Sequence, residues 1–416
     1  MISLRGTVVI VGALDTKGVE FRFVQEILQK QGLGTLLIDV GVLEDSGMLV
    51  DITSSDVAVA AGTTIEQLRF WNDRGRAVTA MSEGIFHIVN RLVQEGKVDG
   101  IFGMGGTAGT TVVASAMKAV PIGTPKLIVS TVASGNTRPY VGVKDVTMMY
   151  SVVDIAGLNR LSRTILSNAA YALGGMVLGA ASEALALDEH EQPKTTIGMT
   201  MFGVTTPCVT KVREIVEARG YDVLVFHATG AGGLAMEALI DAGFIQGIVD
   251  ITTTELADEL VGGIFSAGPE RLEAGARAGI PQVVSVGALD MVNFGSPDTV
   301  PAQFQDRLFY QHNATTTLMR TTTLENSELG RVLAGKLNGA KGPVVLIFPL
   351  GGVSLLDRKG QPFEGNEQRA ALLTSIKQNL RTDIPLIEVE QDINDEAVAE
   401  AIAEHFLRII GSEMKR

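Results

Sequence analysis

The sequence predicts an α/β protein whose sheets are mainly parallel and doubly wound. Two observations carry this prediction. Short apolar runs bounded by glycine or proline have the length of buried strands, and they alternate with segments of helical periodicity. Glycines, hydroxyl residues and carboxylates follow these runs, as expected where the carboxyl ends of parallel strands meet at one edge of a sheet.

The first half of the chain contains four apolar runs that we expect to be strands: residues 7–11, 34–40, 98–102 and 126–131. Helical patterns lie between them at 19–30, 64–94 and 111–119. The longest pattern is expected to break near Gly75, because glycine is unfavourable inside a helix.

The second half repeats this organisation after a short charged linker, residues 187–193, so we predict two domains, 1–188 and 194–416. Its expected strands are 195–202, 222–226, 247–251, 282–286, 343–348 and 384–390. Pro207 suits the first turn of a helix that continues to Arg219, and residues 395–410 form an amphipathic helix. The string Gly-Ala-Leu-Asp follows strands at both Gly12 and Gly287, which suggests an internal repeat.

The composition describes a folded, soluble protein. Of 416 residues, 46% are hydrophobic and 19% are charged, and the formal net charge is −13. Nucleic acid is not an expected partner, because clustered Lys and Arg bind it and this acidic chain has no basic stripe. The one cysteine, Cys208, rules out an intrachain disulfide and fits a reducing compartment.

Two segments bear on the location of the protein. The N-terminus reads as a strand and carries no small-residue cleavage site of the signal-peptide type. Residues 165–182 are weakly polar, but they include Ser167 and Asn168 and are short for a membrane span. We interpret this stretch as a buried, closely packed helix and expect a cytoplasmic protein with no membrane partner.

The most informative motif is the turn Gly-Met-Gly-Gly-Thr-Ala-Gly-Thr-Thr at residues 103–111. It connects an apolar strand to a helix, so backbone N–H groups at the helix start are available to an anion, above all phosphate. Glycine lets the backbone approach a ligand closely, and threonine hydroxyls can cap the helix or bond phosphate oxygens. A plain tight turn is the alternative interpretation.

Residues at the other strand ends of the first half also suit a nucleotide ligand. Asp39 ends the second strand, where a carboxylate commonly binds ribose, although it could equally cap a turn. Lys17 could reach a phosphate as a point charge or be a solvated lysine. The chain has no Gly-x-x-x-x-Gly-Lys-Ser/Thr run, which excludes a standard P-loop NTPase. Residues 103–108 match a dinucleotide fingerprint only superficially, since they follow the third strand, and a mononucleotide ranks above NAD.

The second half offers candidate catalytic residues that lie at or just past predicted strand ends: His227, Asp250, Glu255 and Asp290. A histidine beside carboxylates can act as a general base or bind a divalent metal. Each carboxylate could instead cap a helix, and His227 could be bonded to backbone. His312 and Arg320 could hold an anionic substrate, while Cys208 at a helix start is either a nucleophile or, more commonly, a small packing residue.

Longer strings resemble the Tm-1-like ATP-binding domain family of bacteria, fungi and plants. They are Gly-Met-Gly-Gly-Thr-Ala-Gly-Thr (103–110), Ser-Gly-Asn (134–136), Thr-Met-Phe-Gly-Val-Thr-Thr-Pro (200–207), Phe-His-Ala-Thr-Gly-Ala-Gly-Gly (226–233), Leu-Asp-Met-Val-Asn-Phe (289–294), and His-Asn with Leu-Met-Arg-Thr (312–321). The resemblance covers residues 12 to about 394. It implies two Rossmann-like domains, a homodimer, and ATP held by the N-terminal domain.

Carried onto this chain, the resemblance places the phosphates of ATP on the glycine-rich turn: Gly105, Gly106, Thr107, Gly109, Thr110 and Thr111, with the three threonines also donating hydroxyl bonds. Three further groups would surround the nucleotide: Asp39 and Thr53 on the ribose side, Asp15, Thr16 and Lys17 on the opposite wall, and Gly135 and Asn136 at the phosphate end. Mg²⁺ is expected with the triphosphate, and the sequence does not fix its ligands.

Three classes of function agree with these observations. The first is an ATP-dependent enzyme acting on a small anionic metabolite between the two domains. The second is a nucleotide-sensing regulatory protein without turnover. The third is a metal-dependent hydrolase or lyase in the second domain, with a non-catalytic ATP site in the first.

Overall fold

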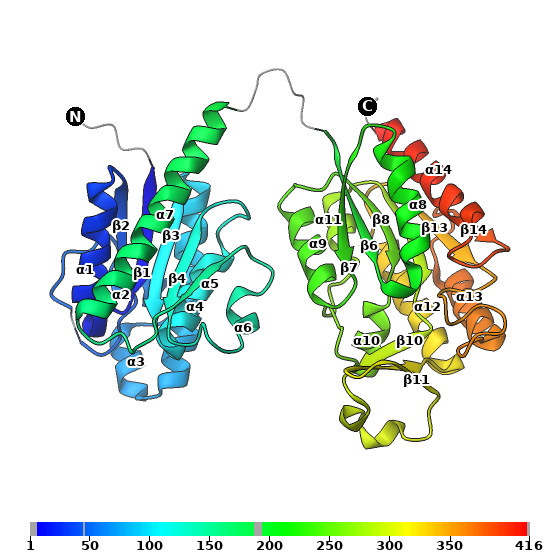
Figure 1. Ribbon diagram of the computed structural model, residues 1–416, viewed down its shortest axis with the longest axis horizontal. Helices are drawn as coiled ribbons and strands as arrows, with labels where there is room; N and C mark the ends of the chain where they lie inside the picture. The colour runs from blue at the N-terminus through cyan, green and yellow to red at the C-terminus, as the bar shows by residue number, and fades with distance from the viewer. Residues whose placement is uncertain (1–5, 45, 187–193, 414–416) are drawn as a thin grey trace. The chain divides into compact units, whose positions relative to one another are not determined.

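The computed structural model describes residues 6–44, 46–186 and 194–413. The chain divides into two compact units, Met1–Glu191 and Gln192–Arg416, and each is described by itself (Figure 1). The predicted linker, residues 187–193, lies outside the described residues. The predicted α/β class with two mainly parallel, Rossmann-like sheets is confirmed.

The first unit is built on a five-stranded parallel sheet in the order β2-β1-β3-β4-β5. Its strands are β1 (Thr7–Gly12), β2 (Gly34–Asp39), β3 (Gly100–Gly105), β4 (Lys126–Ser130) and β5 (Thr147–Tyr150). Alternate side chains of each strand point to opposite faces, and both faces are apolar, as required when helices cover both. The sequence did not predict β5, whose residues are half exposed.

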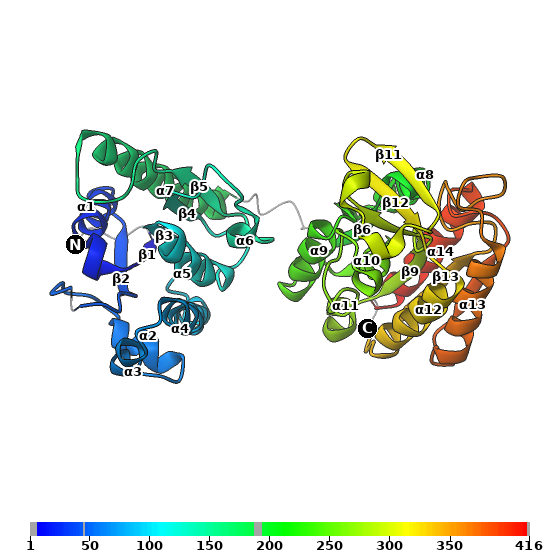
Figure 2. The same cartoon turned by 90° about the horizontal axis from the view of Figure 1, so that it is seen from below.

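Helices cover the two faces of this sheet (Figure 2). They are α1 (Leu14–Lys30), α2 (Ser54–Ala60), α3 (Ile65–Trp71), α4 (Arg74–Gln94), α5 (Thr107–Lys118), α6 (Arg138–Val141) and α7 (Arg160–Ala186). One core joins the sheet to α2–α5 and the other joins it to α1 and α7. The predicted interruption near Gly75 is found slightly earlier: α3 ends at Trp71, Asn72 is left-handed with a φ of 47°, and α4 begins at Arg74 with Gly75 inside its first turn.

Helix α7 differs from its prediction. Within the described residues, its stretch Arg160–Ser182 is the one helical segment long and apolar enough to cross a membrane by length and composition alone. Within the most apolar 18-residue window of that stretch 33% of the residues are buried, so the expectation of a buried, closely packed helix is wrong for its outer face. Leu166, Leu173 and Val177 pack in the core beside α1, so α7 packs against the sheet through one face.

The second unit contains a six-stranded parallel sheet in the order β14-β13-β9-β8-β6-β7. Its strands are β6 (Thr196–Met201), β7 (Asp222–His227), β8 (Gly247–Thr252), β9 (Gln282–Gly287), β13 (Val344–Pro349) and β14 (Leu386–Val389). Its helices are α8 (Thr206–Glu217), α9 (Ala231–Asp241), α10 (Glu255–Val261), α11 (Ala274–Ala278), α12 (Thr323–Asn338), α13 (Asn366–Asn379) and α14 (Glu396–Glu413). Helices α8 and α14 pack on one face and the others on the opposite face.

A small antiparallel sheet follows β9 and was not predicted. It has the order β10-β12-β11, with β10 (Met291–Phe294), β11 (Phe309–Asn313) and β12 (Thr316–Arg320). No strand is expected here from the sequence, because β11 is largely exposed and lacks an apolar run. It adds a hairpin, β11–β12, that contributes residues to the site described below.

The two Gly-Ala-Leu-Asp strings occupy different places in the folds. The first follows β1, the first strand of its sheet, whereas the second follows β9, the fourth strand of the other sheet. Leu14 begins helix α1, but Ala288 has a positive φ of 58° and leads into the antiparallel sheet. The strings are therefore not equivalent members of an internal repeat.

Candidate functional site

Both sheets have a switch point, where the direction of strand addition reverses. In the first unit it lies between β1 and β3, and in the second between β6 and β8. Ligands of open α/β sheets bind beyond the carboxyl ends of the strands at such points. The predicted residues Asp15, Thr16 and Lys17 follow β1, and the glycine-rich turn follows β3, so the two groups lie on either side of the first switch point.

Helix α5 begins immediately after β3. Strand β3 runs to Gly105, Gly106 is the residue before the helix, and the helix starts at Thr107, so the turn is shorter than residues 103–111 suggested. The first intrahelical bond runs from Thr110 N–H to Gly106 O at 2.8 Å. In the described part of the chain, no partner meets the N–H groups of Thr107, Ala108 and Gly109, and no side chain caps the helix.

The predicted threonines have different surroundings. Thr110 is fully buried, and its hydroxyl lies 2.7 Å from that of Ser130 at the end of β4. Thr111 is exposed and donates to the carbonyl of Thr107. Thr131, which is not among the predicted site residues, has its Oγ1 3.6 Å from the position of a Cβ added to Gly106. Thr131 therefore faces the start of α5 from the next strand end.

Two carboxylates organise the turn after β1. The Oδ1 atom of Asp39, which is buried at the end of β2, accepts N–H bonds from Leu14 at 3.0 Å and Gly41 at 2.8 Å. Burial raises the pKa of Asp39, although these two bonds oppose the rise. Asp15 Oδ2 accepts from Leu43 N–H, whereas its Oδ1 is buried without a partner. Asp39 thus has a turn-stabilising role, and Asp15 keeps one free acceptor.

The other predicted residues of this edge make local contacts. Lys17 Nζ donates to the carbonyl of Ile155 at 2.5 Å. Thr53 caps α2 in a capping box with Asp56. The remaining three are exposed at loop or helix starts: Thr16, Gly135 and Asn136.

In the second unit, Asp250 is fully buried in an ion-pair network. Arg271 binds it in a bidentate manner, at 2.6 Å and 2.9 Å, and also reaches Glu255 at 2.6 Å. Burial alone would lower the pKa of Arg271, but Asp250 and Glu255 raise it well above its ordinary value. Arg271 lies in a loop after α10, and no sequence pattern singled it out.

Asp290 is also buried, away from Asp250's network. Its Oδ2 accepts from the Ser354 hydroxyl at 2.8 Å, and its Oδ1 has no partner. Burial raises the pKa of Asp290 to about 7, and the neighbouring Asp357 carboxylate adds to the rise. Arg320 bonds Asp357 at 2.9 Å, so this predicted anion-binding arginine is engaged inside the protein.

Cys208 is 1% exposed at the start of α8. Burial raises the pKa of its thiol to about 12. A nucleophilic cysteine needs access and a lowered pKa, so this residue has the properties of a packing residue.

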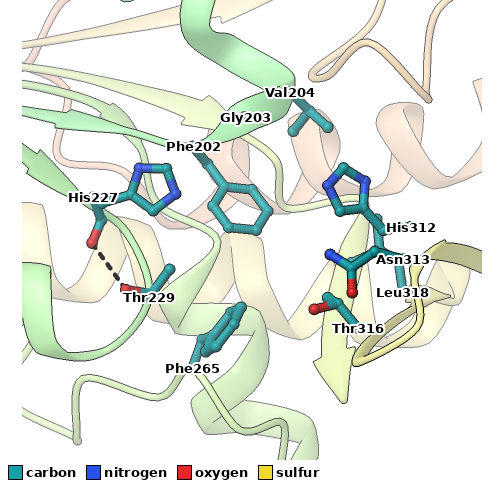
Figure 3. Close-up of a pocket in the computed structure, with 10 residues that line it drawn as sticks. All are labelled: Phe202, Gly203, Val204, His227, Thr229, Phe265, His312, Asn313, Thr316 and Leu318. Carbon is teal, nitrogen blue, oxygen red and sulfur yellow. Dashed lines mark hydrogen bonds between the residues drawn. The ribbon is translucent and has the colours of Figure 1, made fainter. Parts of the chain in front are cut away.

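A cavity of about 200 Å³ lies at the carboxyl edge of the second sheet (Figure 3). Its wall comes from the ends of β6 and β7, the loop after α10 and the hairpin β11–β12: Phe202, Gly203, Val204, His227, Thr229, Phe265, His312, Asn313, Thr316 and Leu318. Of the predicted catalytic residues, His227 lines this cavity, while Asp250 and Asp290 do not. His312 lines it from the hairpin, and Phe202 stands between the two imidazoles (Figure 3).

Each domain has a parallel sheet in which the direction of strand addition reverses once. Together they define a two-domain, Rossmann-like α/β protein whose candidate sites lie at the strand ends. Comparison with known families agrees with the division. Residues 6–182 match the family model described as "Uncharacterised protein family (UPF0261) N-terminal domain". Residues 194–410 match the model of the C-terminal domain of the same family. The chain belongs to the UPF0261 family.

Two relatives illustrate the breadth of this family. A UPF0261 protein of Clostridium tetani is 51% identical over 97% of this chain and 98% of its own length. The ToMV resistance protein Tm-1(GCR237) of Solanum lycopersicum is 40% identical over 96% of this chain but only 55% of its own length. Among solved structures, the UDP-N-acetylglucosamine 2-epimerase of Rickettsia bellii is 11% identical over 99% and 97% of the two chains. Its TM-score is 0.23, so no inference about activity rests on it.

Proposed function

We propose that the first domain binds ATP at the carboxyl edge of its sheet, between β1 and β3, with the phosphates at the start of α5. The observation that carries this proposal is the set of three unpartnered N–H groups on Thr107, Ala108 and Gly109. They lie at a switch point of the sheet and carry the partial positive charge of a helix N-terminus. The resemblance to the Tm-1-like family supports adenine nucleotide as the phosphate source.

The second domain provides an internal comparison for this proposal. There, Glu255 Oε1 accepts from Gly230 and Gly233 N–H at the start of α9, at 2.7 Å and 3.0 Å. Glu237 likewise accepts from Leu272 and Ala274 N–H around the start of α11. At these two helix starts the protein supplies a carboxylate of its own. The first turn of α5 contains no acidic residue.

Mg²⁺ fits the same edge. It commonly binds nucleotides through one or two carboxylates together with phosphate oxygens and water. Asp15 has a buried Oδ1 without a partner, which makes it the residue that would hold the ion. When bound, Mg²⁺ would neutralise charge on the phosphates. Within the described residues there is no group of three or more His, Cys, Asp or Glu side chains that could hold a metal unaided.

We further propose an ATP-dependent enzyme that acts on a small anionic metabolite, in a cytoplasmic homodimer. The single cysteine, in a chain without a disulfide, supports the compartment. The exposed, small residues Ala172, Gly175 and Gly179 on α7 permit close packing of a second copy. The competing function is nucleotide sensing without turnover.

Calorimetric titration of the full chain with ATP·Mg²⁺, followed by an ADP-release assay, tests the proposal. Binding with ADP release that depends on an added metabolite supports the enzyme. Binding without release under any tested metabolite favours the sensor. Absence of heat at about 1 mM ATP contradicts nucleotide binding at a useful affinity.

A further inference from the structure

We propose that the cavity of the second domain is a separate binding site for a small carboxylic acid with a short apolar or aromatic body. The site uses the hairpin β11–β12 as one wall and the ends of β6 and β7 as the other. It lies at the carboxyl ends of β6 and β7, the edge of the sheet where α/β proteins take ligands, although β8 on the other side of the switch point contributes no lining residue. This inference does not depend on ATP binding in the first domain.

Several hydrogen-bond donors line the cavity. In the described part of the chain neither the His227 nor the His312 imidazole has a hydrogen-bond partner, so each can turn an N–H toward a ligand, and the two rings face the cavity from opposite walls (Figure 3). Asn313 Oδ1 already accepts from the N–H and hydroxyl of Thr315, at 2.9 Å and 3.0 Å. Its NH₂ group is therefore left for a ligand, and it points toward Phe202 (Figure 3).

Backbone donors strengthen this preference for an anion. A 3₁₀ turn, Gly203–Thr205, leads directly into α8, a helix of 12 residues. Among the described residues, nothing accepts from the N–H groups of Gly203 and Val204, and both residues line the cavity. A helix start of this kind favours a negative group. The donors of the backbone and of the side chains thus come together around one cavity.

The charges around the cavity narrow the ligand class. The formal net charge of the chain is −13, yet none of the ten lining residues is Asp or Glu. Asp250 lies in the neighbouring strand β8 and Glu255 follows it, and both are paired with Arg271 and not with the cavity. The lining also contains no Lys or Arg to balance the second charge of a phosphate monoester. Neutral donors and imidazoles suit a single carboxylate better than a phosphate.

The apolar part of the lining determines which non-polar part of a ligand fits the cavity. Phe202 and Phe265 meet edge to face at 6.2 Å, and Val204 and Leu318 complete an apolar surface. A flat ring or a short branched chain can pack there with favourable aromatic contacts. A volume of about 200 Å³ is below the usual range of about 300–1,000 Å³ for drug-sized ligands, so a molecule of metabolite size is expected.

Benzoate is a suitable probe, with benzamide as its uncharged counterpart. The full chain, without nucleotide, is titrated while the imidazole ¹H–¹⁵N signals of its five histidines are followed. His227→Gln and His312→Gln assign the two relevant signals, and His87→Gln, at an exposed position of α4 in the other unit, is the control. We expect benzoate to move both assigned signals and to bind about tenfold more tightly than benzamide. Each of the two site variants should weaken benzoate about tenfold, and His87→Gln should not.

Gly203→Leu blocks the cavity in an independent way. A Cβ at Gly203 has no atom within 4 Å, so the variant should fold, and its side chain should occupy the site. Loss of benzoate binding with an unchanged melting temperature supports the proposal. Equal binding of benzoate and benzamide, retained binding in Gly203→Leu, or no movement of either imidazole signal at about 50 mM benzoate overturns it. Because no step involves ATP, failure here leaves the nucleotide proposal intact.

Discussion

Glu255 Oε1 accepts the backbone N–H of Gly230 at 2.7 Å, so the second domain places its own carboxylate at the start of α9. Helix α5 of the first domain has no such group, and its start is framed by Gly106 and Thr131. The two helix starts therefore differ: a carboxylate of the same domain satisfies the N–H groups of α9, whereas the first N–H groups of α5 have no partner among the described residues.

The two adjacent glycines of the turn should respond differently to substitution. A Cβ on Gly105 would lie 2.9 Å from Gly109 Cα, whereas one on Gly106 meets only Thr131 Oγ1 at 3.6 Å. Gly105→Ala should therefore lower the free energy of unfolding by about 1–3 kcal/mol. Gly106→Ala should change it by less than about 0.5 kcal/mol. Urea unfolding of both variants measures the difference, and equal costs would contradict the described turn.

Arg271 should be a stability residue. Arg271→Met would leave Asp250 and Glu255 buried without their partner, a change that typically costs about 3–5 kcal/mol. Arg277→Ala is the control, because its ion pair with Asp241 is half exposed and worth less than about 1 kcal/mol. Denaturant midpoints of the two variants test the assignment. A stable Arg271→Met protein would show that the network does not hold the domain together.

Asp290 should make stability depend on pH. Its pKa is about 7 in the folded protein and near 3.8 when unfolded, so the folded state binds the extra proton between these values. Stability contributed by this group is therefore present at low pH and falls as pH rises toward 7. Asp290→Asn removes the titration, so its stability relative to the natural protein should rise between about pH 4 and 7 and stay constant at higher pH. Asp306→Asn, in an exposed loop, is the control, and parallel profiles for Asp290→Asn and the natural protein would contradict the burial of this carboxyl.

Cys208 should be unreactive in the native protein. Its thiol is 1% exposed and its pKa is raised to about 12, so little thiolate forms at neutral pH. A chromogenic thiol reagent should modify it only after unfolding by denaturant. Rapid stoichiometric labelling of the native chain would instead indicate an accessible thiolate.

The sequence predicted the two parallel sheets because their strands are buried on both faces and read as continuous apolar runs. The antiparallel sheet was missed for the opposite reason, since β11 is exposed and has no such run. Helix α7 was misjudged because small residues such as Gly175 look equally apolar on a buried and on an exposed face.

The candidate sites were less predictable than the fold. His227, Asp250 and Asp290 all follow or occupy strands, but strand position alone does not tell which side chains face a cavity. Asp250 pairs with Arg271, 21 residues further along the chain, and no local sequence pattern predicts that ion pair. The cavity depends on Phe265 and Asn313, which come from a loop and a hairpin that only the tertiary structure brings together.

The most direct test of nucleotide binding in the first domain is the affinity of Gly106→Val for ATP·Mg²⁺, measured by calorimetry beside the natural protein. The position is open enough for the variant to fold, but the valine side chain should occupy the space in front of the first N–H groups of α5. We predict a melting temperature close to that of the natural protein and an affinity reduced at least about tenfold, the equivalent of 1.4 kcal/mol. Unchanged ATP affinity in a folded Gly106→Val protein would contradict the assignment of the phosphates to this turn.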